Sequence, residues 1–168
     1  GYNLAMPDLE GKEYLGDGVY RLYNANGITI DYDIYTGINE INGTTTNAGG
    51  RNYVESIFDS SYNPMIMSFH PISGNRTIGT SSISNYSSSG TPPSINLINL
   101  PLDNNNASSI IGNPNNSFWG NTRNISIFID LGVTFNNYKF KLQLEKGDTA
   151  TPYTVPGQIP QYKIVGEE

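Results

Sequence analysis

The sequence predicts an all-β protein, and both its composition and its residue patterns point to this class. The 168 residues include 12 tyrosines, 18 glycines and 10 prolines, and Asn, Ser and Thr are abundant while Ala, Lys and Glu are few. This composition favours strands and turns over helices. Several segments alternate apolar and polar residues, and no segment shows helical periodicity. About eight to ten short strands in one domain predict an antiparallel β-sandwich or a β-barrel.

The first strands are expected after residues 1–18, which Pro and Gly interrupt and which we interpret as an N-terminal lead-in. "GVYRLYNANGITIDYDIY" then predicts a hairpin that turns at Asn26 and Gly27, a pair typical of tight turns. Further short strands are expected in "INEINGTTTN" and "RNYVESIF". The segment "PMIMSFHPI" is apolar on both faces, which predicts a central, covered strand, with His70 at the end of its apolar part "MIMSFH".

The middle of the chain, residues 73–120, is rich in Ser, Asn, Gly and Pro, and we interpret it as long loops with one strand in "SINLINL". Alternation returns in "RNISIFIDLG" and "NNYKFKLQLEKG", which predict two more strands. The polar face of the second strand, which includes Gln143 and Glu145, is expected to meet solvent. The sandwich is therefore expected to span residues 19–154, before an exit linker at 155–168.

Charge and cysteine content narrow the range of partners. The net charge is −6 and only 14% of the residues are charged, so a nucleic-acid partner is not expected, because phosphate backbones are bound by clustered Lys and Arg. No apolar run approaches the roughly 20 residues that span a bilayer, so membrane insertion is not expected either. The chain has no cysteine, which excludes disulfides and thiolate metal sites.

The segment "FKLQLEKGDTATPYTV" resembles a recurring ending in tail, baseplate and receptor-binding proteins of bacteriophages and prophages. In that group the last strand reads roughly Gln-Leu-Glu-x-Gly-x-x-Ala-Thr-x-Tyr. The matching residues are Gln143, Leu144, Glu145, Gly147, Ala150, Thr151, Pro152 and Tyr153. The order of "NGITIDYD" and "INGTTTN" upstream is similar as well. The resemblance implies a β-sandwich of jelly-roll type that serves as a carbohydrate-binding module on bacterial surface glycans.

The same ending has a physical interpretation without the resemblance. Gly147 permits a positive φ after the strand, and Pro152 fixes its own φ and provides no ladder donor. Tyr153 is expected to fold back as an apolar plug with a polar tip. The segment is thus predicted to be the end of a strand and a clamp where the chain leaves the module.

A sugar site needs aromatic faces for the C–H side of the ring and amides, carboxylates or Arg for the hydroxyls. Trp119, the only tryptophan, lies in the polar segment "NNSFWGNTRN" beside Asn121 and is a candidate stacking platform, although capping of the core is an equal alternative. The other candidate ligand-binding residues are Tyr86, Tyr62, Tyr53, Arg51 and Arg76. Each of these also has an ordinary structural interpretation, as a packed tyrosine or a solvated charge.

Neither metal nor catalytic chemistry has a specific signal. His70 has no His or Cys partner for zinc, and we interpret it as a strand-end residue. Asp31, Asp33 and Glu40 fail the EF-hand template, because Gly37 falls at the seventh rather than the sixth position of the loop and Tyr35 replaces the third acidic ligand. A looser calcium site stays open. There is no G-x-S-x-G elbow and no phosphate loop. We expect no catalytic residues and no cofactor.

Together with the all-β pattern, the resemblance implies a non-catalytic carbohydrate-binding module in the tail of a phage or prophage particle, which is expected to adsorb to bacterial surface polysaccharide and to contact other tail proteins. Two alternatives stay open. One is a purely structural or homo-oligomerisation module of a tail fibre or baseplate, and the other is a small glycan-cleaving enzyme.

Overall fold

The computed structural model describes the backbone of residues 2–54, 65–77, 81–87, 96–101, 107–111 and 123–157, and the side chains of residues 2–54, 65–77 and 125–157. Within these residues every regular element is a β-strand and none is a helix, which confirms the predicted all-β class.

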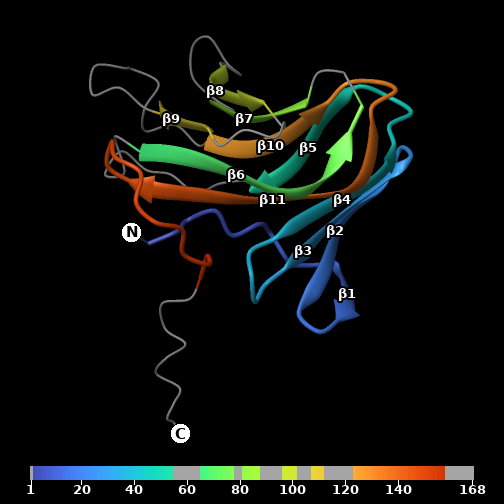
Figure 1. Cartoon of the computed structure of the whole chain (residues 1–168), viewed down its shortest axis with the longest axis horizontal. Helices are drawn as coiled ribbons and strands as arrows, with labels where there is room; N and C mark the ends of the chain where they lie inside the picture. The colour runs from blue at the N-terminus through green and yellow to red at the C-terminus, as the bar shows by residue number, and fades with distance from the viewer. Residues whose placement is uncertain are drawn as a thin grey trace, which may run out of the picture.

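Eleven strands in the described residues form two antiparallel sheets (Figure 1). The larger sheet has the order β1-β2-β3-β4-β11-β6-β9 and the smaller one the order β5-β10-β7-β8. The larger sheet contains β1 (Glu13–Gly16), β2 (Val19–Ala25), β3 (Ile28–Asp33), β4 (Asn39–Thr44), β11 (Thr134–Lys146), β6 (Met65–Arg76) and β9 (Ala107–Ile111). The smaller sheet contains β5 (Gly49–Val54), β10 (Arg123–Ile129), β7 (Ser81–Ser87) and β8 (Asn96–Pro101).

The two sheets lie against each other and enclose one hydrophobic core, with the smaller sheet uppermost in Figure 1. The rings of Tyr32 on β3 and Tyr53 on β5 meet edge to face across the two sheets, with centroids 6.4 Å apart. From β4 onward every connection except that from β7 to β8 passes from one sheet to the other. Because strands alternate their faces, the buried Ile30 and Tyr32 place Asp31 and Asp33 on the opposite, outer face of the larger sheet.

The segment that is apolar on both faces forms the central strand β6, as predicted. Residues 65–69 are all buried, and β6 pairs with β11 on one edge and β9 on the other. The prediction that this strand ends at His70 is wrong, because β6 continues to Arg76. Proline is tolerated at position 71 because the pairing with β9 stops at Phe69 and the pairing with β11 has an irregularity opposite Pro71.

The middle of the chain contains more strand than the sequence indicates. β8 overlaps the predicted "SINLINL" strand and extends one residue beyond it, to Pro101, but β7 and β9 fall in segments for which the sequence predicts loops. Polar residues such as those of "SSISNYS" can pair in a sheet because backbone hydrogen bonds do not depend on the side chain, and the apolar alternation that usually marks a strand is weak there.

The N-terminal segment, interpreted from sequence as a lead-in, is packed into the domain. Asn3 and Ala5 are buried, and Leu4 N donates to Leu144 O at 2.7 Å along β11, beyond the point where β4 stops pairing. Further along, Asp8 N donates to Tyr53 O on the smaller sheet at 3.0 Å. The segment thus lies along β11 of the larger sheet and is also hydrogen-bonded to the smaller sheet.

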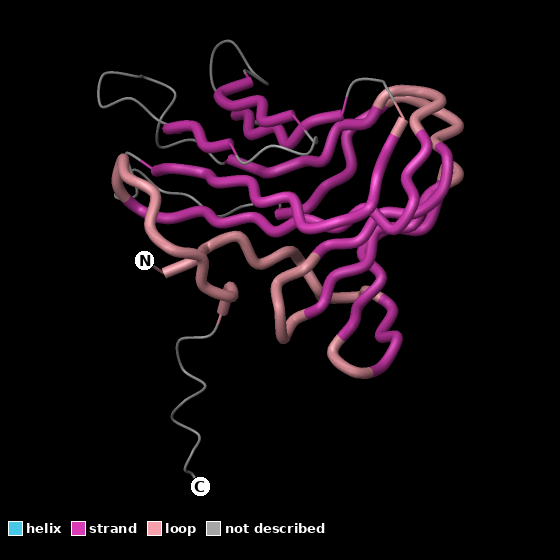
Figure 2. The backbone as a smooth tube through the Cα atoms, in the orientation of Figure 1, coloured by secondary structure: helices cyan, strands magenta, loops and turns pink. Residues whose placement is uncertain are grey.

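The C-terminal segment also lies against the larger sheet, and Figure 2 shows both terminal segments beneath β11. The prediction that the polar face of β11 meets solvent is wrong at Gln143 and Glu145, which are 0% and 2% exposed. Gln143 Nε2 donates to Thr151 O at 3.0 Å and its Oε1 accepts from Thr154 N at 2.7 Å. Glu145 Oε2 accepts from Thr151 N at 3.1 Å and from Gln143 Nε2 at 2.9 Å. These two side chains therefore bind the segment that follows the strand.

The attachment of this segment should depend on pH. Burial raises the pKa of Glu145, but hydrogen bonds from Thr151 and Gln143 outweigh burial and hold the pKa below its ordinary value of 4.5. A lowered pKa in the folded state means that the carboxylate stabilises the protein above pH 4.5 and that this contribution is lost as the pH falls through the folded-state pKa. Unfolding free energy measured against pH should therefore fall more steeply below pH 4.5 in the wild type than in Glu145→Gln. Parallel curves would contradict this role.

Candidate functional site

A row of charged side chains crosses five strands on the outer face of the larger sheet. Its members are Glu13 on β1, Arg21 on β2, Asp31 on β3, Glu40 on β4 and Lys139 on β11, and each is the cross-strand partner of the next. The row is visible only once the strands are in register, since its members lie far apart in the sequence.

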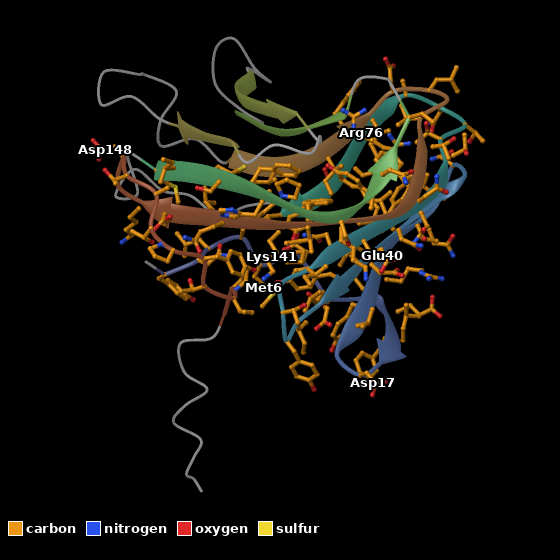
Figure 3. All side chains as sticks on the ribbon, viewed as in Figure 1. Met6, Asp17, Glu40, Arg76, Lys141 and Asp148 are labelled. Atoms are coloured by element: carbon orange, nitrogen blue, oxygen red, sulfur yellow. The ribbon has the colours of Figure 1, made fainter. Side chains whose placement is uncertain are left out.

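A cleft of about 150 Å³ opens on this row. It is lined by Val19, Asp31, Asp33, Thr36, Ile38, Glu40 and Lys139. Figure 3 labels Glu40 on this part of the larger sheet. The volume is below the roughly 300–1,000 Å³ of sites for drug-sized ligands, so the cleft suits one small polar group, such as a single ring of a longer chain.

The charges in the row are only partly compensated. Arg21 binds Asp31 through two hydrogen bonds of 2.9 and 3.1 Å, and the bond to Asp31 raises the pKa of Arg21. Lys139 Nζ lies 3.9 Å from Glu40 Oε1. Asp31 and Glu40 are direct cross-strand partners, and like charges opposite each other are destabilising. Together with Asp33, the cleft presents more carboxylate than cation.

The turn between β3 and β4 forms one wall of the cleft and carries an exposed tyrosine. Asp33 Oδ1 accepts from Tyr35 N at 2.8 Å and from Thr36 N at 3.3 Å, and Gly37 N donates to Asp33 O at 2.8 Å. These bonds fix the turn. The Tyr35 side chain is 67% exposed, and its ring packs on Gly18, where a Cβ atom would collide with it. Tyr35 therefore offers an aromatic surface beside the cleft.

A second, shallower groove adjoins the first on the same sheet face, with a volume of about 310 Å³. Asn24, Thr29 and Asn42 form the next cross-strand row, and Asn42 Nδ2 donates to Glu40 Oε2 at 2.9 Å, which links the two grooves. The groove is lined by Asn24, Ala25, Asn26, Gly27, Ile28, Thr29, Asn42 and Gly43. Amides and hydroxyls therefore continue the polar surface beyond the charged row.

Two of the residues that we singled out as ligand-binding candidates lie inside the protein. Arg51 and Tyr53 are on β5 and are 3% and 2% exposed. The Arg51 guanidinium donates to Ile129 O at 3.0 Å and lies 5.5 Å from the centroid of the Tyr23 ring. Burial raises the pKa of Tyr53 well above its usual range. In these positions both side chains support the packing of the two sheets rather than offering a surface to a ligand.

Among the remaining candidates, Arg76 is the one whose side chain is described. Arg76 is at the end of β6, where its Nη1 donates to Thr77 O at 3.0 Å, and it does not line the cleft. Tyr86 belongs to β7, but its side chain is outside the described residues, as are Tyr62, Trp119 and Asn121 altogether.

The acidic residues considered for calcium do come together, since Asp31, Asp33 and Glu40 all line the cleft. Arg21 and Lys139 contact two of these carboxylates. Among the described residues no group of three or more His, Cys, Asp or Glu side chains has an arrangement that could hold a metal ion.

Sequence reasoning did not identify Tyr35, Thr36 or Lys139 as site residues. The available signal was the run "DYDIYTGINE", whose outward-facing acidic residues flank a turn with an aromatic residue at its tip. Lys139 could not have been added from sequence, because it joins the cleft only through the pairing of β11 with β4.

Comparisons of the chain with known protein families, with curated proteins and with solved structures found no match. The described residues also contain no helix with the length and apolar character of a membrane span.

Proposed function

We propose that the protein is a non-catalytic carbohydrate-binding module of a phage or prophage tail or receptor-binding protein, and that the cleft on the outer face of the larger sheet takes one sugar unit of a bacterial surface glycan. The observation that carries this proposal is the cleft itself, with carboxylates and a lysine in its walls and the exposed ring of Tyr35 beside it.

The chemistry of the cleft suits a hydroxyl-rich ligand. Asp31 and Glu40 can accept hydrogen bonds from sugar hydroxyls, and Lys139 can donate to ring or hydroxyl oxygens. An aromatic face such as that of Tyr35 packs against the C–H side of a pyranose ring. One small cleft gives weak affinity, near a millimolar dissociation constant, but many copies on one particle would raise the avidity by roughly 10²–10⁴.

The fold and the C-terminal motif support the rest of the proposal. The orders β4-β11-β6-β9 and β5-β10-β7-β8, with repeated crossings between the sheets, support a jelly-roll type of sandwich, in which eight strands form two Greek keys. The resemblance of "QLEKGDTATPY" to tail-protein endings supports a place in the virion tail, where bacterial surface polysaccharide and other tail proteins are the partners.

The proposal predicts that loss of the Tyr35 ring weakens glycan binding. Tyr35→Ala should lower the affinity for a bound surface glycan by roughly three- to tenfold, the range expected for one aromatic contact. Tyr2→Ala is the matched control, because Tyr2 is also exposed, at 49%, but belongs to the N-terminal segment and not to the turn that forms a wall of the cleft. The measurement is binding of the whole chain to an array of bacterial surface polysaccharides, followed by titration of the best glycan.

A second variant moves the ring without removing it. Gly18→Ala should also weaken binding, because the new Cβ atom would collide with the Tyr35 ring. Gly16→Ala is the control. Gly16 has a similar positive φ, but a Cβ atom there would have no other atom within 4 Å, so binding should not change. Equal affinity of the wild type, Tyr35→Ala and Gly18→Ala for a glycan that the protein binds would place the site elsewhere.

The two other function classes give different results in the same experiments. A structural module would bind no glycan on the array and would form a stable oligomer in solution. An enzyme would release new reducing ends from envelope polysaccharide.

A further inference from the structure

The turn that carries Tyr35 is also in contact with the C-terminal segment. Gly37 lies in this turn at a φ of 75°, and a Cβ atom there would collide with Tyr153 Oη and would lie 3.4 Å from Pro156 Cδ. Tyr153 is therefore packed directly against the backbone of the turn. The prediction that Tyr153 folds back onto the module agrees with this contact.

The ring of Tyr153 is held in place by two side chains of the larger sheet. It meets His70 of β6 edge to face, with centroids 5.9 Å apart. Lys141 Nζ of β11 lies 4.7 Å from its centroid. Figure 3 labels Lys141 below β11 in this view. The Tyr153 hydroxyl is buried, and burial raises the pKa of Tyr153 to about 12.

The backbone on both sides of Tyr153 is fixed as well. Gln143 Nε2 donates to Pro152 O at 3.3 Å, and Gln143 Oε1 accepts from Thr154 N at 2.7 Å. Asn3 Nδ2 donates to Thr154 O at 2.8 Å. Tyr153 is thus a rigidly held side chain, and the turn rests against its tip.

The turn is also held at Ile34 and Tyr35, where Ile34 N donates to Gly18 O at 2.9 Å and the Tyr35 ring packs on Gly18, whereas Tyr153 supports it at Gly37. Its internal hydrogen bonds come from Asp33 and from Thr36 Oγ1, which accepts from Ile38 N at 3.2 Å. Three of its residues, Asp33, Thr36 and Ile38, line the cleft, so a shift of the turn changes the shape of the cleft.

We propose that Tyr153 is a positioning residue for the turn between Asp33 and Ile38, and that the C-terminal segment thereby sets the geometry of the cleft. The role of the cleft rests on the proposed function above, but the contact of Tyr153 with the turn does not. The end of the "QLEKGDTATPY" segment then has two roles. It packs the C-terminal segment against the larger sheet, and it supports the turn whose residues line the cleft.

The test is a double-mutant cycle read by hydrogen exchange of the whole chain. Tyr153→Ala should raise the exchange rates of the amides of residues 33–38 roughly tenfold through local opening. Gly37→Ala should do the same, because its Cβ atom would push against Tyr153. In the Tyr153→Ala background, Gly37→Ala should add only the effect of backbone strain.

A glycine with the same backbone conformation gives the cost of that strain in unfolding free energy without the contact to Tyr153. Gly11 also has a φ of 75°, but a Cβ atom there would have no atom within 4 Å. Gly11→Ala should leave exchange in residues 33–38 unchanged, and so should Thr149→Ala, which alters the C-terminal segment at an exposed hydroxyl that bonds only locally to Asp148. Denaturant unfolding of each variant shows whether the fold as a whole is retained.

The outcomes separate the positioning role from the proposed function. The positioning role is supported if exchange at the turn is faster in both Tyr153→Ala and Gly37→Ala and if the effect of the double variant is smaller than the sum of the two single effects. This result holds whether or not a glycan binds. Unchanged exchange in both variants, or the same exchange in Gly37→Ala and Gly11→Ala, overturns the positioning role. If Tyr35→Ala weakens glycan binding, Tyr153→Ala should weaken it too, and an affinity lowered by Tyr35→Ala but not by Tyr153→Ala overturns the control of the cleft by the C-terminal segment. An affinity unchanged in both variants counts against the proposed function and not against the contact of Tyr153 with the turn.

Discussion

Replacing Asn3 by alanine is expected to lower the free energy of unfolding by about 3 kcal/mol or more, although the residue lies in a segment without regular structure. The Asn3 amide is buried and makes four hydrogen bonds to backbone groups. Its Nδ2 donates to Leu142 O at 2.9 Å and to Thr154 O at 2.8 Å. Its Oδ1 accepts from Leu144 N at 3.0 Å and from Ala5 N at 2.9 Å.

The size of this effect follows from what the alanine leaves behind. A buried backbone group that loses its partner costs about 1–3 kcal/mol, and Asn3→Ala removes the partner of several such groups at once. The amide also connects three parts of the chain, namely the N-terminal segment, β11 and the C-terminal segment at Thr154. Its loss should therefore loosen both terminal segments together.

Denaturant unfolding of the wild type and of Asn3→Ala measures this cost. Asn136→Ala is the matched control, because the Asn136 amide is exposed and bonds only to Asn75 Oδ1, at 3.1 Å. The control should change stability by less than about 0.5 kcal/mol. If Asn3→Ala were as mild as the control, the N-terminal segment would be a detachable lead-in after all.

The sequence predicted the strands whose two faces differ clearly in polarity. Ile28, Ile30 and Tyr32 alternate with polar residues and are buried, as expected. Alternation reports which residues of a strand share a face, because successive side chains point to opposite sides. It does not report what covers each face, so the polar side chains of Gln143 and Glu145 could not be recognised as buried.

The role of the terminal segments was hidden for a similar reason. Asn3 forms its hydrogen bonds with residues that are 139 and 151 positions away in the sequence. No local pattern records such contacts, and an isolated Asn near glycines and prolines looks like any loop residue. The C-terminal clamp was more predictable, because Gly147, Pro152 and Tyr153 each restrict the backbone or favour burial in a way that can be read locally.

The candidate site shows the same limit. Tyrosines in loops are good contact residues, which is why the sequence favours Tyr53 as a candidate. Tyr53 is instead on strand β5, and its side chain is buried in the core. Tyr35, which is exposed beside the cleft, was no more prominent in the sequence than the other tyrosines. The cleft depends on strand register, which brings Asp31, Glu40 and Lys139 into one row.

Replacing Gln143 by glutamate is expected to have the other large effect, a loss of about 3–5 kcal/mol near neutral pH, as for other uncompensated buried charges. The two side chains have nearly the same shape, so the variant tests chemistry rather than volume. Glutamate cannot donate to Thr151 O, which now receives a bond of 3.0 Å from Gln143 Nε2. It would also place a second carboxylate where an amide nitrogen now lies 2.9 Å from Glu145 Oε2.

The contribution of this pair of residues to the free energy of unfolding should depend on pH with the opposite sign in Gln143→Glu and in the wild type. Two buried carboxylates in contact raise the pKa of one of them, because both cannot be charged at that distance. A raised pKa in the folded state destabilises the protein at high pH, and protonation relieves this as the pH falls. The gap in unfolding free energy between wild type and Gln143→Glu should therefore narrow between about pH 7 and pH 4.

Gln143→Met separates the charge from the lost hydrogen bonds, since methionine is of similar length and bears no charge. Gln143→Met should lower the free energy of unfolding because groups such as Thr151 O and Thr154 N lose their hydrogen-bond partners. The gap in unfolding free energy between the wild type and Gln143→Met should not narrow as the pH falls, unlike the gap for Gln143→Glu. Equal pH profiles for the two variants would mean that Glu145 is solvated in the folded protein and that the C-terminal segment is not clamped over β11. A narrowing confined to Gln143→Glu is the result that a buried clamp requires, because only close, desolvated carboxylates interact this strongly.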